Sequence, residues 1–84
     1  MSKRVEIRLP DFGEGDDGKG KAVVCFWHVE VGATVSCGED LLEIVTDKAG
    51  FVVPCPVMGI LREKCVHEDS SVRVGDVIAI METI

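Results

Sequence analysis

Glycine and proline interrupt this chain so often that long helices are excluded. Nine glycines and three prolines are spread over 84 residues, and both residue types are unfavourable inside a helix. The segments between them are rich in β-branched residues, which favour strands. These segments are Val5–Leu9, Ala22–Trp27, Leu41–Thr46, Phe51–Val53, Ile60–Val66 and Val77–Met81. Short strands separated by turns predict an all-β protein, either a sandwich or a barrel.

The same pattern of residues occurs twice, 37 positions apart. Val35, Gly38, Leu41 and Ile44 recur as Val72, Gly75, Ile78 and Met81. Neither half is large enough to bury its own apolar face, so we expect the two halves to pack together with approximate two-fold symmetry. A turn glycine of the first half, Gly32, corresponds to Asp69. Aspartate tolerates a left-handed backbone better than most residues, so this exchange fits a shared turn geometry.

The charge of the chain excludes several classes of partner. Nine lysines and arginines stand against 15 aspartates and glutamates, which gives a net charge of −6. Binding to nucleic acid or to an anionic membrane requires clustered cations, so neither is expected. No apolar run approaches the roughly 20 residues that span a bilayer, and the N-terminus lacks the apolar core of a signal peptide. We expect a protein of the bacterial cytoplasm, with the mitochondrial matrix as the alternative.

The cysteines and histidines do not form a recognisable metal site. Cys25, Cys37, Cys55 and Cys65 include no C-x-x-C pair, which structural zinc sites commonly use. Without a secretory context, cysteines act most often as small buried hydrophobes. We therefore expect four reduced, buried thiols and no metal.

A polar segment between two apolar runs predicts a hairpin with a lysine at its tip. The segment is Thr46–Gly50, and Lys48 is at its centre. A catalytic amine needs burial or a neighbouring cation to lower its pKa, and the adjacent Asp47 has the opposite effect. Lys48 is therefore either a solvated turn residue without a special role or an exposed amine presented for enzymatic acylation.

Several motifs in order resemble one protein family. Leu9–Gly15 (LPDFGEG), Trp27–Gly32 (WHVEVG), Glu43–Ala49 (EIVTDKA) and Val53–Gly59 (VPCPVMG) lie in the sequence as they do in lipoyl domains. The chain resembles the lipoyl domain of the acyltransferase component of 2-oxo acid dehydrogenase complexes. The resemblance covers residues 5–82, and we expect residues 1–4 and 83–84 to be flexible ends.

The resemblance implies a fold and a carrier function. The fold would be a flattened β-barrel, or sandwich, of two four-stranded antiparallel sheets with a pseudo-two-fold axis. Lys48 would carry lipoic acid in amide linkage, and Asp47 and Ala49 would help a lipoyl ligase recognise it. The implied partners are a thiamine-dependent 2-oxo acid decarboxylase, the acyltransferase core and dihydrolipoamide dehydrogenase. The chemistry would belong to the cofactor, and the isolated domain would be a non-catalytic monomer.

The resemblance also indicates which residues recognise the partner enzymes. In this family the loop that follows the first strand contributes to partner choice. Here it contains Glu14, Gly15, Asp16 and Asp17, and the segment from Gly15 to Trp27 is longer than is usual. Glu43 is retained before the lysine and is a further candidate. The glycines in this loop are not a dinucleotide site, because no helix follows them.

Three other functions are compatible with parts of this pattern. A biotin carrier has the same fold, but its lysine is usually flanked by methionines rather than by Asp47 and Ala49. The carrier protein of the glycine cleavage system is longer. An unmodified protein-binding domain with the same fold remains open. An enzyme is disfavoured because no nucleophile–base pair is recognisable.

Overall fold

Strands make up all the regular structure in the described part of the chain. The computed structural model describes residues 3–12 and 21–83, and no helix occurs in these two ranges. Their strands are β1 (Lys3–Arg8), β2 (Lys21–Trp27), β3 (Thr34–Val35), β4 (Asp40–Val45), β5 (Gly50–Pro54), β6 (Gly59–Lys64), β7 (Ser71–Arg73) and β8 (Val77–Thr83). The all-β prediction is confirmed.

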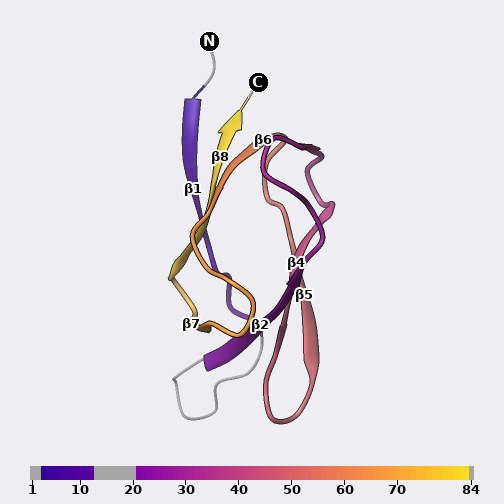
Figure 1. The fold of residues 1–84 in the computed structure, drawn as a ribbon, viewed down its shortest axis with the longest axis vertical. Coiled ribbons are helices and arrows are strands. Elements are labelled where there is room, and N and C mark those ends of the chain that lie inside the picture. The colour runs from indigo at the N-terminus through magenta and orange to yellow at the C-terminus, as the bar shows by residue number, and fades with distance from the viewer. Residues whose placement is uncertain (1–2, 13–20, 84) are drawn as a thin grey trace.

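The strands form two four-stranded sheets that face each other. One sheet has the order β1-β8-β6-β3 and the other the order β5-β4-β2-β7, and neighbouring strands are antiparallel. The domain is elongated, with extents of 41 × 20 × 19 Å, and its strands run roughly along the long axis (Figure 1). Alternating side chains of both sheets fill the space between them, and no polar or charged described residue is buried there. The flattened arrangement predicted from the resemblance is confirmed.

The two halves are related by the 37-residue offset, as the repeat predicts. The amide of Gly32 donates to the carbonyl of Leu61 at 2.7 Å, and the amide of Asp69 donates to the carbonyl of Val24 at 2.8 Å. These bonds are equivalent, because 32 and 69, like 24 and 61, differ by 37. Gly32 and Asp69 both have positive φ, at 95° and 71°. The shared left-handed turn is therefore confirmed.

The sheets extend further than the sequence pattern indicates. Lys3 pairs with Thr83 and Arg4 pairs with Glu82 in the β1–β8 ladder, so the ends expected to be flexible include paired strand residues. The expectation of flexible ends came from the family resemblance, which covers residues 5–82. A ladder is held by backbone hydrogen bonds, however, and exposed edge residues do not need apolar side chains. The short strands β3 and β7 were also not predicted, because two or three residues give no periodic signal.

The expectation of buried cysteines is wrong for most of them. All four thiols are free, but only Cys55 is buried. Cys25 lies at a bulge where the β2–β4 register shifts between Val24 and Phe26, and its side chain is exposed. This exposure follows the alternation of β2, in which Ala22 and Val24 are buried and Val23 is exposed. The residue that departs from the alternation at the bulge is Phe26, which is also exposed.

The described residues contain neither a candidate metal site nor a candidate membrane-spanning helix. Within residues 3–12 and 21–83, no group of three or more histidine, cysteine or acidic side chains could hold a metal ion. In the same ranges no helix is long and apolar enough to cross a membrane.

Candidate functional site

Lys48 lies on the turn that joins β4 to β5. These strands pair from Asp40 opposite Pro54 to Val45 opposite Gly50, and the amide of Thr46 donates to the carbonyl of Ala49 at 2.8 Å to close the turn. The predicted hairpin is confirmed. The turn is at one end of the long axis, and β1 begins and β8 ends at the opposite end (Figure 1).

The hydroxyl of Thr46 organises this turn. It accepts hydrogen bonds from the amides of Lys48 at 3.1 Å and Ala49 at 3.2 Å, and it donates to the carbonyl of Ala49 at 3.3 Å. Thr46 is half-buried, whereas Lys48 is exposed. The backbone that carries Lys48 is therefore fixed while its amine stays in solvent.

Thr46 was not singled out as a site residue by sequence reasoning. The available signal was a threonine at the start of a short polar turn, where a hydroxyl commonly binds backbone amides one to three residues ahead. The hydrophobic pattern predicts the strands on either side of the turn, but it does not indicate which hydrogen bonds stabilise the turn itself.

Of the predicted recognition residues near Lys48, two lie on its turn and one lies away from it. Asp47 and Ala49 flank Lys48 on the turn, and both are exposed. Glu43 lies further back on β4, opposite Phe26 of β2, and its carboxylate contacts the Nε2 atom of His28 at 2.9 Å. Glu43 therefore contacts a residue of the neighbouring strand region and is not part of the turn that carries Lys48.

Four further residues were predicted to contribute to partner recognition. Glu14, Gly15, Asp16 and Asp17 lie outside the described residues. Their role in partner recognition stays a prediction.

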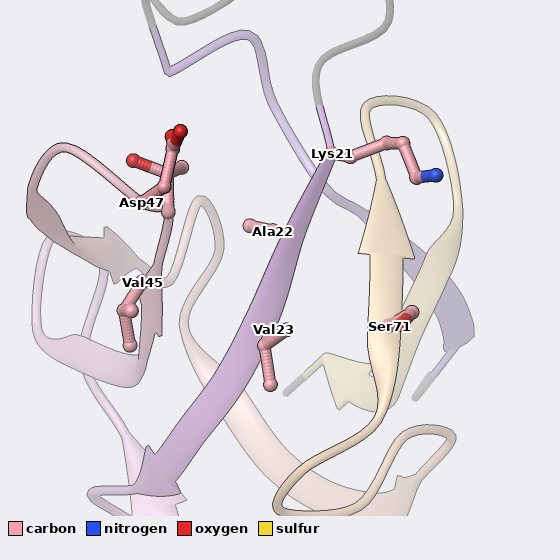
Figure 2. A pocket seen from close by; sticks show the side chains of 7 residues that line it. Lys21, Ala22, Val23, Val45, Asp47 and Ser71 are labelled. Atoms are coloured by element: carbon pink, nitrogen blue, oxygen red, sulfur yellow. The ribbon is translucent and has the colours of Figure 1, made fainter.

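A shallow depression of about 370 Å³ adjoins the turn. Figure 2 shows its lining side chains, which come from the start of β2, the end of β4 with the following turn, and β7. Val23 and Val45 lie directly opposite each other in the β2–β4 ladder, and Ser71 pairs with Val23 on the other side. Sequence reasoning did not identify this depression, because it depends on three strands that are distant in the chain. It is lined by Lys21, Ala22, Val23, Val45, Thr46, Asp47 and Ser71.

Comparison with known proteins gives a family match over nearly the whole chain. The biotin/lipoyl family model, described as "Biotin-requiring enzyme", matches residues 5–81. Among curated proteins, the dihydrolipoyllysine-residue acetyltransferase component of the pyruvate dehydrogenase complex of Corynebacterium glutamicum is 39% identical over 75 residues. The corresponding component of Staphylococcus aureus is 41% identical over 73 residues. These alignments cover 89% and 87% of this chain but only 11% and 16% of the two relatives.

A solved structure supports the same assignment of the fold. The lipoyl domain of the 2-oxoglutarate dehydrogenase complex from Azotobacter vinelandii superposes with a TM-score of 0.68 at 26% sequence identity. The superposition covers 95% of this chain and 96% of that domain.

Proposed function

The chain belongs to the family of biotin- and lipoyl-attachment domains, and from this premise we propose that it is a carrier domain with a lipoyl group in amide linkage on Lys48. The observation that carries the proposal is the position of Lys48, an exposed amine on a turn whose backbone Thr46 holds by hydrogen bonds. A modifying enzyme needs to reach the amine and to find it in one place. This turn meets both conditions.

The residues around Lys48 fit a lipoyl group better than biotin. Asp47 and Ala49 flank the lysine where biotin carriers usually have methionines. The relatives named above are dihydrolipoyllysine-residue acetyltransferases, and the structural neighbour is a lipoyl domain. Both lines of similarity favour lipoic acid as the cofactor.

The domain contributes tethering and presentation. When bound, the lipoyl group supplies the capacity to carry acyl groups and electrons, which the protein side chains lack. Lys48 holds it covalently at one end of a 41 Å long domain. A longer chain joined near the start of β1 or the end of β8 would leave this tip free to reach several active sites at raised effective concentration.

The proposed partners follow from the same similarity. They are a lipoyl ligase, a thiamine-dependent 2-oxo acid decarboxylase, an acyltransferase core and dihydrolipoamide dehydrogenase. The relatives named above are bacterial, which supports the bacterial cytoplasm as the proposed location. The net charge of −6 favours basic docking surfaces on these partners.

The test is the intact mass of the protein purified from its own cells, with fragmentation to locate any adduct. We expect a lipoyl increment on Lys48 that is absent from Lys48→Arg. Lys21→Arg is the matched control, because Lys21 is exposed near the same turn and its loss should leave the increment in place. An unmodified mass that persists after incubation with lipoyl ligase, lipoate and ATP would refute the proposal and favour an unmodified binding domain. A biotin increment would assign the domain to the carboxylases.

A further inference from the structure

The outer face of the β5-β4-β2-β7 sheet has an apolar area beside Lys48. Val23 and Val45, whose side chains are 39% and 38% exposed, form a cross-strand pair on this face. They lie in the depression of about 370 Å³ that Thr46 and Asp47 also line. Figure 2 shows their side chains together, with that of Lys21 directed away from them.

The pseudo-symmetry provides an internal reference for this face. Adding 37 to the numbers of Cys25 and Val45 gives Arg62 and Glu82 of the opposite sheet. Those two residues form an ion pair, with the Nε atom of Arg62 2.7 Å from a carboxylate oxygen of Glu82. The mate of Val23 is the apolar Ile60, so the comparison concerns Val45: the fold accepts a charged side chain at its position and does not require valine there.

We propose that this depression is a resting site for the lipoyl arm of Lys48, an inference that depends on the proposed function. Thr46 and Asp47 line the depression and directly precede Lys48 in the chain, so the arm begins at its rim. The volume suits a small aliphatic group. The alkyl chain of the arm would lie across Val23 and Val45.

Acylation itself makes this contact favourable. The unmodified lysine keeps a charged ammonium that must stay hydrated. In the amide that charge is gone, and the added chain is mostly apolar. Because Val23 and Val45 are only partly covered, the contact is weak and the arm can leave it to reach a partner. The depression thus lowers the exposure of the arm between transfers without holding it permanently.

Methyl-resolved NMR spectroscopy of the lipoylated domain tests this inference. We expect nuclear Overhauser effects between the protons of the acyl chain and the methyl groups of Val23 and Val45, with methyl shifts that differ from those of the unmodified domain. The octanoylated domain should show the same effects, because the contact involves the alkyl chain.

Two variants separate this site from the rest of the sheet. Val45→Glu introduces the residue that the symmetric position already has, and it should abolish the contacts to Val23. Val52→Glu is the matched control, since Val52 is 46% exposed on β5 of the same sheet but does not line the depression, and it should leave the contacts intact.

Each failure has a distinct signature. A lipoylated wild-type domain without contacts or shift changes at Val23 and Val45 would overturn the resting site and leave the carrier function standing. Equal loss of contacts in both variants would overturn it as well. A mass that shows no acyl group on Lys48 after treatment with lipoyl ligase would refute the carrier function, and the resting site with it.

Discussion

Replacing Thr46 with valine should slow acylation of Lys48 about fivefold while lowering the free energy of unfolding by about 1 kcal/mol or less. Valine keeps the β-branched shape but removes the hydroxyl that accepts from the amides of Lys48 and Ala49 and donates to the carbonyl of Ala49. Lys48 and Ala49 are exposed, so water can bind the released amides. The loss should therefore lie at the low end of the range for hydrogen bonds, about 1 kcal/mol in total.

The effect on acylation follows from the same figure. If about 1 kcal/mol of bias toward the closed turn is lost, the fraction of molecules that present Lys48 correctly can fall about fivefold. We expect kcat/KM for lipoyl ligase to fall by about this factor in Thr46→Val. Urea denaturation should show a loss of about 1 kcal/mol or less in the free energy of unfolding.

The chain contains a matched control for this experiment. Thr83 is the symmetry mate of Thr46, 37 residues later, and its hydroxyl donates to the carbonyl of Lys3 at 3.1 Å. Thr83→Val should cost similar stability and leave acylation unchanged. Acylation of Thr46→Val at the wild-type rate, or an equal slowing in Thr83→Val, would show that the Thr46 hydroxyl does not define the shape that the ligase needs.

Three further predictions concern packing, thiol reactivity and docking. Gly59→Ala should lower the free energy of unfolding by about 3 kcal/mol in urea denaturation, because a Cβ atom there collides with the backbone carbonyl of Glu82. Ala22→Gly, at the equivalent position, should cost only about 1 kcal/mol, and equal effects would contradict the collision. At pH 8 iodoacetamide should modify Cys25 well before Cys55, since burial raises the pKa of the Cys55 thiol and leaves less of it as reactive thiolate. Peptide mass mapping would measure this order. Raising the pH should accelerate modification of Cys55, and unfolding in urea should make the two cysteines react at equal rates. Equal rates of modification in the native state would refute the prediction. Reductive acylation of the lipoylated domain should slow when ionic strength rises from about 0.05 to 0.5 M, because salt screens a net charge of −6; a rate independent of salt would argue against docking through charge.

The regular part of the fold could be predicted because its determinants are local. Glycines and prolines interrupt the chain, and β-branched runs fill the intervals, so strand identity follows from residue type. The 37-residue repeat also predicted the shared left-handed turn at Gly32 and Asp69, which have φ values of 95° and 71°. Backbone preference at single residues is sufficient for such features.

Errors arose where pairing between strands overrides local pattern. The family resemblance begins at Val5 and leaves Lys3 and Arg4 in an end expected to be flexible, but the β8 backbone pairs with both. Cysteine is commonly a core residue, but Cys25 takes the outward position that follows the buried Val24 on β2. Neither outcome can be read from residue type alone, because the first depends on pairing with a distant strand and the second on which face of β2 meets the core.

The sequence by itself determined the longer strands, the symmetry and the identity of Lys48 as the exposed turn lysine, since each follows from residue type and spacing. Only the tertiary structure decided what surrounds that lysine. The three bonds of the Thr46 hydroxyl require the closed turn, and the depression requires β2, β4 and β7 side by side. Val23, Val45 and Ser71 are neighbours only because antiparallel pairing aligns residues that are far apart in the chain.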